Sequence, residues 1–458
     1  MKVRNPRTGL YDYEISQLSF ETLKIKADAM RHAQKSWQAI GIEQRIKTIQ
    51  RWKKVLERHL EELTEVLIVD TGRKIETVYE INLVLTAIDQ FCDLAQDYFK
   101  VEVQTILHNN TYHIEEYSEP FELVGIISTW QFPFQSTMMQ VIPALLAGNS
   151  VLVKPSEKTP RFVKVLEKTI SQIPHFNNFL HFIEGEKEVG EMLCSITDLI
   201  CFTGTEEKAK KVFETSAKHF VPAQLEFGGK GAAIITETAD IESASSAILW
   251  GGTFNAGQSL ESIERVYVHR NIHSQFLSRL VGKSNLLTLN YPNIEQGQIG
   301  PIITEKQATN INEQLADAVK KGAVIVAGSE KCIVQKGSIY CRPTILTNVN
   351  HQMKIMKEMT FGPILPVKSF LNETQALDFA NDSNSVFNCS VFAGKDSEAM
   401  KIARRIKSKS ITINDVYMGN RFYGNEKSST NSPETKAENI GTFSFKKFLK
   451  NKNLMFKK

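Results

Sequence analysis

A chain of 458 residues is long enough for about three domains, each with a core of its own. Its composition, 42% hydrophobic and 23% charged, is typical of a soluble globular protein and excludes a disordered chain. The net charge of +4 comes from Lys and Arg spread along the chain, so nucleic acid is not an expected partner.

The N-terminal residues 1–14 contain no apolar stretch of the kind found in signal peptides, and no apolar run approaches the ~20 residues of a membrane span. Six cysteines are scattered along the chain without a CxxC pair. In a chain of this size, that pattern favours reduced thiols and predicts neither disulfides nor a zinc site. We therefore expect a cytoplasmic protein.

The first hundred residues are expected to be helical. Large apolar side chains recur every three or four residues from Ile46 to Leu67, and Gly72 follows them as a helix stop. Residues 110–128 come next. Their first half alternates polar positions, as an edge strand does, and their second half predicts a continuous apolar strand.

From residue 123 onward, short apolar strands alternate with helices of about three turns. This alternation predicts βαβ units and a parallel sheet covered on both faces. Strands are expected at 123–128, 151–156, 179–185 and 199–204, and helices end at 149 or span 161–173, 187–196 and 206–220.

The alternation starts again after Lys230, which predicts a second α/β domain. The last forty residues are polar and weakly periodic, and they predict a loop with a closing strand or tail. In the second domain, strands are expected at 232–235, 266–268, 324–327, 364–370, 390–393 and 411–413, and helices at 273–283, 305–321, 374–381 and 397–407.

Five motifs follow one another along the chain. They are ISTWQFPF…PALLAGNSVLVKPSEKTP (127–160), FTGT (202–205), LEFGGK (225–230), FNAGQSLESIERVYV (254–268) and FGPILPV (361–367). In this order and at this spacing they resemble the motifs of the aldehyde dehydrogenase superfamily over essentially the whole chain.

The resemblance implies an α/β fold with a Rossmann-type nucleotide-binding domain, a second α/β catalytic domain and a small β oligomerisation arm. The nucleotide-binding domain is expected at 1–107 and 121–228, the arm and tail at 108–120 and 441–458, and the catalytic-fold domain at 229–440. A homodimer or homotetramer is the expected assembly. The opening VRNPRTG, with LNYP (289–292) and GNEK (424–427), looks most like bacterial members that oxidise long-chain or apocarotenoid aldehydes.

Members of this family oxidise an aldehyde to a carboxylic acid with NAD(P)⁺. The reaction needs a nucleophile, donors for the oxyanion, a general base and a cleft for the nicotinamide. Glu226 matches the family's base in LEFGGK, and Gly228 beside it allows close backbone approach. Taken alone, this glutamate is also compatible with a turn-capping role.

The nucleophile position of the family pattern is occupied by Leu260. Gly257 and Gln258 before it and Arg265 five residues after it fix the register. A leucine side chain has no heteroatom, so no thiohemiacetal can form at this position. The catalytic cysteine is therefore missing.

No neighbour in the sequence is expected to replace this cysteine. The hydroxyls of Ser259 and Ser262 are unactivated and far poorer nucleophiles than a thiolate, and Cys201 is expected to be a structural thiol. The oxyanion donor is altered as well, because Gln131 replaces the family's asparagine and moves the amide by about one methylene. A misplacement of ~1 Å can cost about a hundredfold in rate.

The expected cofactor is NAD, with weakened binding, because Met359 stands where the family places a glutamate on the nicotinamide ribose. Losing such hydrogen bonds costs about 1–3 kcal/mol. Glu157 favours NAD over NADP, and no metal site is expected. The expected cofactor-binding residues are Trp130, Lys154, Ser156, Glu157, Gly185, Phe202, Gly204, Thr205, Phe227, Gly228, Met359 and Phe361.

Three hypotheses remain open. The first is a catalytically impaired family member that keeps a small-molecule aldehyde or remnant ligand, or acts as a non-enzymatic, partner-binding pseudoenzyme subunit. The second is an active NAD-dependent enzyme for long-chain or apocarotenoid aldehydes, seen with a substituted site, and the third is simple hydrolysis by Glu226. The tail, residues 443–458, interleaves aromatic residues with lysines, which is compatible with contact to an anionic membrane; we prefer a closing strand with a basic end.

Overall fold

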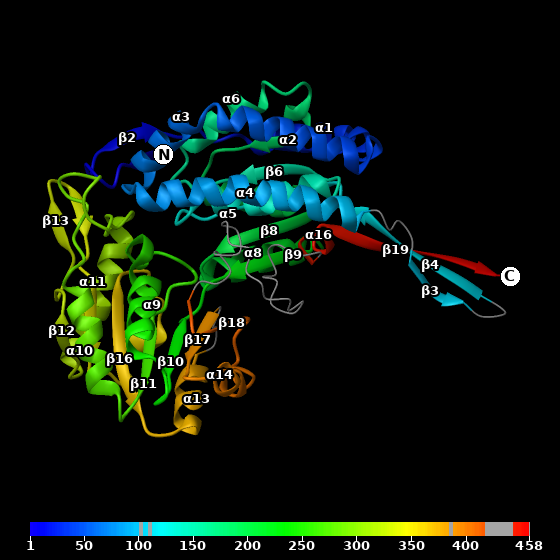
Figure 1. Cartoon of the computed structure of the whole chain (residues 1–458). Helices are drawn as coiled ribbons and strands as arrows, with labels where there is room; N and C mark the ends of the chain where they lie inside the picture. The colour runs from blue at the N-terminus through cyan, green and yellow to red at the C-terminus, as the bar shows by residue number, and fades with distance from the viewer. Residues whose placement is uncertain (100–103, 109–111, 384–387, 417–442, 458) are drawn as a thin grey trace.

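The computed structural model describes residues 1–99, 104–108, 112–383, 388–416 and 443–457 (Figure 1). These residues form two large α/β units and a thin three-stranded sheet that projects from one of them. The unit around the five-stranded sheet is called the first layer below, and the unit around the seven-stranded sheet is called the second layer. The expected α/β architecture is confirmed.

The first hundred residues are not helical from the start, because a two-stranded hairpin at 2–14 precedes four helices. The helices contain one more break than the apolar spacing indicated. The apolar side chains between residues 46 and 67 belong to two helices, separated at Arg58 and His59. Gly72 ends the second of these in the left-handed region (φ 73°), as expected. No helix among the described residues is long and apolar enough to cross a membrane. The four are α1 (Phe20–Ala39), α2 (Gly41–Glu57), α3 (Leu60–Thr71) and α4 (Ile75–Tyr98).

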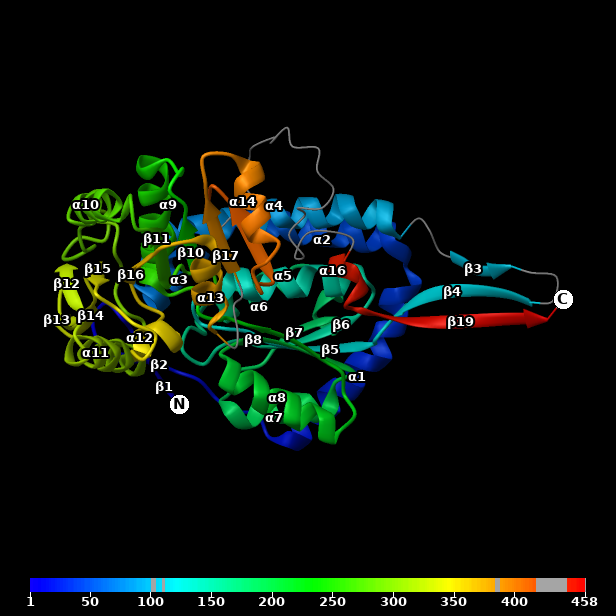
Figure 2. The same cartoon turned by 90° about the horizontal axis from the view of Figure 1, so that it is seen from below.

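The first sheet is parallel throughout and has the order β7-β6-β5-β8-β9. Helices α2 to α6 pack on one face, and α1, α7 and α8 pack on the other (Figure 2). Its strands are β5 (Leu123–Ile127), β6 (Ser150–Lys154), β7 (Leu180–Phe182), β8 (Leu199–Gly204) and β9 (Ala223–Phe227). Its helices are α5 (Pro133–Leu146), α6 (Phe162–Ile170), α7 (Lys187–Ile196) and α8 (Glu206–Lys218).

The second sheet has the order β12-β15-β16-β11-β10-β17-β18, and all its pairs are parallel except β12 with β15. Its strands are β10 (Ala232–Ile235), β11 (Arg265–His269), β12 (Val324–Ala327), β15 (Thr344–Thr347), β16 (Ile364–Phe370), β17 (Asn388–Phe392) and β18 (Ser410–Ile413). The surrounding helices are α9 (Ile241–Thr253), α10 (His273–Ser284), α11 (Glu305–Lys320), α12 (Lys354–Lys357), α13 (Glu373–Asn381) and α14 (Asp396–Ala403).

The projecting sheet, called the arm below, is antiparallel and has the order β19-β4-β3 (Figure 1). Its strands are β3 (Gln104–His108), β4 (Tyr112–Pro120) and β19 (Leu449–Lys457). The tail therefore contains the closing strand that we preferred, and the arm also takes in residues 104–107. A short helix, α16 (Phe443–Lys446), precedes β19. The GNEK stretch at 424–427 lies outside the described residues.

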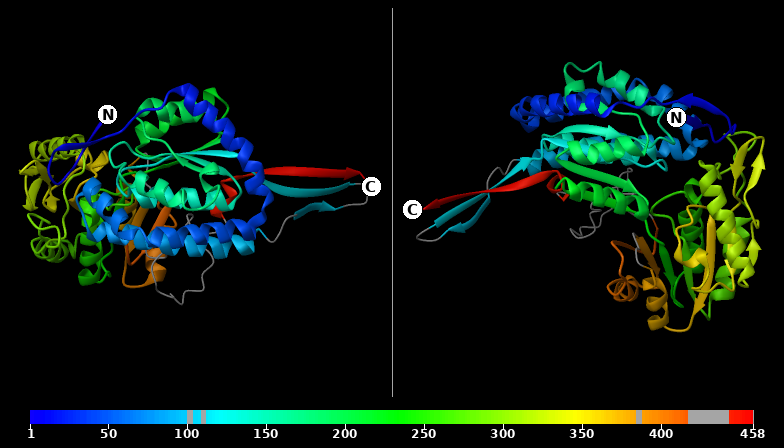
Figure 3. Two further views of the ribbon diagram at one scale, coloured as in Figure 1. Left: turned by 90° about the horizontal axis from the view of Figure 1, so that it is seen from above. Right: turned by 180° about the vertical axis from the view of Figure 1, so that it is seen from behind.

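An N-terminal hairpin, β1 (Lys2–Arg4) with β2 (Tyr11–Glu14), touches both large layers. Arg4 donates to the carbonyl of Gly337 at 2.6 Å in the second layer. The Tyr13 hydroxyl donates to Glu184 at 3.1 Å in the first layer. Residues far apart in the chain are thus joined by its first segment (Figure 3).

The expectation of unpaired cysteines was wrong for one pair. Cys332 and Cys341 form a disulfide, with their Cα atoms 4.3 Å apart. They flank the hairpin of β13 (Ile333–Gln335) and β14 (Ser338–Tyr340), whose antiparallel register places them opposite one another. A nine-residue separation does not resemble a CxxC motif, so the sequence pattern gave no sign of this pairing.

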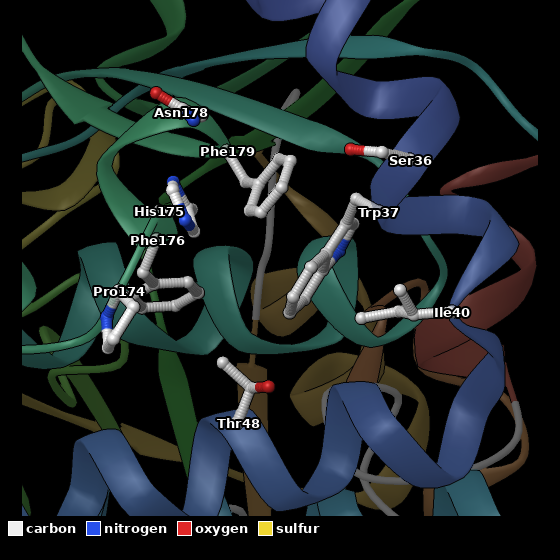
Figure 4. A pocket seen from close by; sticks show the side chains of 9 residues that line it. All are labelled: Ser36, Trp37, Ile40, Thr48, Pro174, His175, Phe176, Asn178 and Phe179. Carbon is white, nitrogen blue, oxygen red and sulfur yellow. The ribbon is translucent and has the colours of Figure 1, made fainter.

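A hollow of about 400 Å³ lies on the first layer (Figure 4). Trp37 of α1 and Phe179 stack against one another in its lining, with their ring centroids 4.8 Å apart. None of the predicted site residues lines this hollow.

Candidate active site

The predicted cofactor residues gather at the carboxyl edge of the first sheet. Trp130 follows β5, Lys154 ends β6, Gly185 follows β7, Gly204 ends β8 and Phe227 ends β9. Because the five strands are parallel, their carboxyl ends lie along one edge, which is where open α/β sheets bind ligands. The structure therefore brings these residues to one side of the sheet.

Lys154 and Glu157 form a largely buried ion pair at the end of β6. The Lys154 Nζ lies 3.2 Å from Glu157 Oε2 and also donates to the carbonyl of Pro155 at 3.3 Å. Burial lowers the pKa of Lys154 despite the nearby carboxylate. Burial alone would raise the pKa of Glu157, but the charges of Lys154 and Lys208 and the hydrogen bonds to the carboxylate together outweigh burial and lower that pKa. Ser156 lies between them, and its hydroxyl accepts from the backbone N–H of Lys158 at 3.3 Å.

The turn after β8 leads directly into the N-terminus of α8. Thr205 caps this helix by accepting from the N–H of Lys208 at 3.4 Å. A Cβ at Gly204 would lie 2.5 Å from the ring of Phe202, so only glycine fits beneath that ring. A capped helix N-terminus beside a glycine turn is a common anion-binding arrangement.

The loop that carries Leu260 is tightly fixed. The buried side chain of Gln258 donates to the carbonyls of Asn255 and Pro301, both at 3.1 Å, and accepts from the N–H of Ile303 at 2.9 Å. Gly257 has φ 69°, and a Cβ there would lie 2.2 Å from the carbonyl oxygen of Gly362. The loop therefore packs directly against the segment that follows Met359.

Leu260 and Met359 both pack against Gly228. A Cβ on Gly228 would lie 2.5 Å from the terminal methyl of Met359 and 2.8 Å from Cδ2 of Leu260. The predicted nucleophile position and the predicted ribose-binding position thus end in neighbouring apolar groups at the head of the β9–β10 turn. Neither side chain offers a nucleophile or a strong hydrogen-bonding group.

Gln131 is buried in the loop between β5 and α5. Its side-chain oxygen accepts from the Thr129 hydroxyl at 3.1 Å. Its backbone carbonyl accepts from the Asn255 amide at 3.1 Å, which ties this loop to the loop of Leu260. The structure therefore places Gln131 beside the Leu260 loop.

Glu264 holds the segment that carries Met359 and Phe361. Its carboxylate accepts from the N–H of Thr360 at 3.0 Å and from the N–H of Phe361 at 2.9 Å. Lys230 forms a buried ion pair with the same carboxylate at 2.9 Å. Phe361 consequently keeps a left-handed φ of 47°, which is unusual for a bulky residue, and its ring lies 6.3 Å from the ring of Trp130.

Both carboxylate oxygens of Glu226 have a donor. The Gln140 amide of α5 donates to Oε2 at 3.1 Å, and Lys447 donates to Oε1 at 3.4 Å. Burial favours the neutral acid, but the charges of Lys447 and Lys409 and the bond from Gln140 outweigh it. The pKa of Glu226 consequently lies below its usual value.

The alternative nucleophiles are all engaged or inert. Ser262 donates its hydroxyl to the carbonyl of Gly257 at 3.0 Å, and Ser259 accepts from the N–H of Glu261 at 3.2 Å. Burial raises the pKa of the Cys201 thiol to about 12, so its thiolate form is scarce at neutral pH. The expectation that Cys201 is structural agrees with its place in the core.

Comparison with known proteins agrees with this geometry. The model of the "Aldehyde dehydrogenase family" matches residues 1–449. The chain belongs to the aldehyde dehydrogenase family. It is 31% identical over 419 residues to the lactaldehyde dehydrogenase of Escherichia coli K12, covering 90% of this chain and 86% of that protein.

Two further relatives extend the comparison. The 4,4'-diapolycopene aldehyde oxidase of Methylomonas sp is 29% identical over 398 residues, which cover 84% of this chain and 72% of that protein. The solved structure of PutA from Anabaena variabilis superposes with a TM-score of 0.93 at 42% identity, covering 100% of this chain and 97% of that one. The aldehyde dehydrogenase fold is therefore shown for the whole chain.

Four residues that contact the predicted site residues or their segments were not predicted from the sequence: Asn255, Glu264, Gln140 and Lys447. Asn255 and Glu264 lie inside the FNAGQSLESIERVYV stretch, where a charged residue directly before a buried strand is a signal that could have been used. Gln140 is one polar residue in an otherwise buried helix, and Lys447 lies 221 positions from Glu226. No local pattern links these two to the base position.

Proposed function

We propose that this chain is an impaired aldehyde dehydrogenase, unable by itself to complete the oxidation of an aldehyde to an acid. The observation that carries the proposal is that the side chains of Leu260 and Met359 both lie against Gly228. At the place where the family requires a thiolate, the chain supplies a branched hydrocarbon. The nearby hydroxyls of Ser259 and Ser262 already have backbone partners.

The residues at the sheet edge fit the adenosine half of NAD(P)⁺ better than its nicotinamide half. Lys154 and Glu157 offer a charged donor and acceptor for a ribose, and the N-terminus of α8 suits a pyrophosphate. At the other end, the thioether of Met359 offers only a weak acceptor, while Phe361 and Trp130 keep an aromatic wall. When bound in this family, the cofactor accepts the hydride of the aldehyde. We infer that NAD binds weakly and is preferred over NADP.

The proposed ligand is an apolar aldehyde, or a remnant ligand of the same shape. Leu260 and Met359 make the head of the site hydrocarbon-like, and the relative from Methylomonas is named for a long carotenoid aldehyde. The buried amide of Gln131 keeps a donor for the carbonyl oxygen, displaced by about one methylene from the family's asparagine. Assembly as a homodimer or homotetramer and a cytoplasmic location remain predictions.

Stepwise repair of the site tests the proposal. We compare the native chain, Leu260→Cys, and Leu260→Cys combined with Gln131→Asn and Met359→Glu, using decanal or retinal with NAD⁺ and following NADH. We expect no NADH from the native chain, no sustained turnover from the single variant and measurable NADH from the triple variant. Leu260→Ala opens the same space without a thiol and serves as the control.

Two other results would each replace the proposal. Sustained turnover by Leu260→Cys alone would show a working dehydrogenase that lacks only its nucleophile. An absence of NAD⁺ binding by calorimetry in every variant would instead favour a partner-binding subunit without cofactor chemistry.

A further inference from the structure

The predicted base is bound by a lysine from the far end of the chain. Lys447 lies in the two-residue connection between α16 and β19, and its Nζ is 3.4 Å from Oε1 of Glu226. About a fifth of either side chain is exposed, 17% for the lysine and 21% for the glutamate. This contact is therefore partly shielded from solvent, where an ion pair is stronger than at an open surface.

The position of Lys447 is fixed by its neighbours. Phe445 and Phe448 are both fully buried in the core of the first layer. The ammonium also lies 5.2 Å from the centre of the Phe448 ring. The buried Asn149 donates to the carbonyl of Phe448 at 3.1 Å, which anchors the same turn to the end of α5. The lysine is thus held beside Glu226 by packing and not only by charge.

The other groups around Glu226 act in the same direction or are neutral. Lys409, just before β18, adds a second positive charge, and the Gln140 amide occupies the second oxygen. Cys201 on the adjacent strand is a buried thiol whose pKa lies well above neutral pH. A general base works best when its pKa is near the working pH. Glu226 has a lowered pKa and a donor on each of its oxygens, and both features make it a weaker base.

We propose that Lys447 is a positioning residue that ties up Glu226, so that the segment joining α16 to the arm decides whether this carboxylate can activate water. The inference rests on the proposed role of Glu226 as the family's base. In that role, water attacks a thioester carbonyl, its proton passes to Glu226, and the acid leaves as the thiolate is regenerated. Lys447 and Gln140 oppose this step because each donates to one carboxylate oxygen and stabilises the unprotonated form, which lowers the affinity of Glu226 for the proton.

Infrared titration of the native chain tests the inference without any turnover. With ¹³C-labelled glutamate, the difference between the native chain and Glu226→Gln isolates the carboxylate band of Glu226. Removing an opposite charge at this distance shifts a carboxyl pKa by about 1–3 units. We expect Lys447→Met to raise the pKa of Glu226 by at least about one unit. Lys447→Arg keeps the charge and should keep the low pKa.

Lys450→Met is the matched control, since this exposed lysine on β19 lies 3.9 Å from Glu122 and not beside Glu226. It should leave the titration unchanged. An unchanged titration in Lys447→Met, with a folded protein by circular dichroism, would overturn the inference. A shift of equal size in Lys450→Met would also overturn it, because the effect would then come from general charge.

A kinetic arm separates this inference from the proposed function. In the triple variant Leu260→Cys, Gln131→Asn, Met359→Glu, we expect one equivalent of NADH followed by slow release of acid. Adding Lys447→Met should speed acid release at least about tenfold while leaving the first equivalent unchanged, with a pH profile that follows Glu226. If no variant forms NADH, the prediction that the triple variant regains activity is wrong and the proposed function fails. The infrared titration would still decide the role of Lys447.

Discussion

Leu260 and Met359 alter the chemistry of the site while its backbone stays anchored. Gln258 still fixes the loop before Leu260 through three hydrogen bonds. Glu264 still holds the two backbone N–H groups that follow Met359. We propose that Leu260 and Met359 replace functional groups of the family without removing the scaffold that would position them, which is why repair by side-chain replacement is a meaningful test.

Replacing Met359 with glutamate should strengthen NAD⁺ binding. A carboxylate at this position regains hydrogen bonds to a ribose worth about 1–3 kcal/mol, or roughly a five- to hundredfold gain in affinity. Calorimetry of Met359→Glu against the native chain measures it. Glu358→Gln, at the exposed neighbouring position, should leave the affinity unchanged. Equal affinity in Met359→Glu and the native chain would show that this residue does not reach the cofactor.

The site residues that could be predicted from the sequence are those whose neighbours along the chain fix their position within a motif. Glu226 and Leu260 lie inside motifs whose spacing resembles that of the family, so a place in the site could be predicted for each of them. Gln140 and Lys447 contact the same carboxylate from a different helix and from a segment 221 positions away. Such contacts depend on tertiary packing, so a reading of local patterns does not find them.

At the scale of elements, helix α4 sets the position of the loop that carries Gln131. The buried carboxylate of Glu80 accepts from the first N–H groups of α5, at Phe134 (2.7 Å) and Gln135 (3.0 Å). Arg73 pairs with its other oxygen at 3.1 Å, and the guanidinium lies 4.3 Å from the ring centre of Phe132. A charged cap of this kind fixes both the helix start and the turn before it.

Removing the Glu80 carboxylate should destabilise the fold severely. Glu80→Ala leaves Arg73 buried without its partner, and breaking a buried pair in this way costs about 3–5 kcal/mol. Urea unfolding followed by fluorescence measures the loss. Glu57→Ala on α2 is the control, because that pair with Lys53 is exposed and should change stability by less than about 0.5 kcal/mol. Similar stability in the two variants would contradict this account of the cap.

Strand β7 should contribute to acid sensitivity through His181. Burial, with a smaller effect from Lys26, lowers the pKa of His181 to about 4. In the unfolded chain, His181 binds a proton near the usual histidine pKa of about 6.5, whereas in the folded chain it stays neutral down to about pH 4. The contribution of this histidine to stability is therefore full above pH 6.5 and falls as the pH drops toward 4. His181→Gln should lose less thermal stability than the native chain between pH 7.5 and 5. His32→Gln, at an exposed position, is the control and should lose as much thermal stability as the native chain. An equal loss in His181→Gln would show that His181 is not involved.

Elements with continuous apolar runs were predicted well, and those without them were missed. Strands β5 and β6 are buried throughout their length, β8 is buried except at Thr203, and the three sequences are recognisable as apolar runs. Strand β9 is an edge strand that carries Gln224 and Glu226, so its hydrophobic signal is weak. Helix α9 is rich in serine and glycine and packs through Ile248 and Leu249. Tertiary burial, and not helix propensity, accounts for it.

At the scale of the molecule, the chain's two ends tie separate parts together (Figure 3). The N-terminal hairpin joins the two layers through Arg4 and Tyr13. The C-terminal segment passes the base position at Lys447 and continues into the arm as β19. The C-terminal segment therefore connects the arm directly to a residue in contact with Glu226.

The outer strand of the arm should mediate self-association. Among the described residues, strand β19 pairs on one side only, with β4, and it exposes Met455 (72%) and Phe456 (46%) at this edge of the arm. Met455→Lys with Phe456→Lys should lower the mass measured by light scattering after size exclusion. Val334→Lys, an equally exposed apolar site on another hairpin (68%), should not. An unchanged mass in the double variant would exclude the arm as the contact.

The most direct measurement is NADH formation by the native chain with NAD⁺ and an excess of decanal, combined with mass spectrometry of the intact protein. Our account predicts neither NADH above the protein-free rate nor an acyl adduct, because Leu260 offers no atom that can attack the carbonyl. Aldehyde-dependent NADH formation that disappears in Glu226→Gln would contradict the account and show that another group serves as the nucleophile.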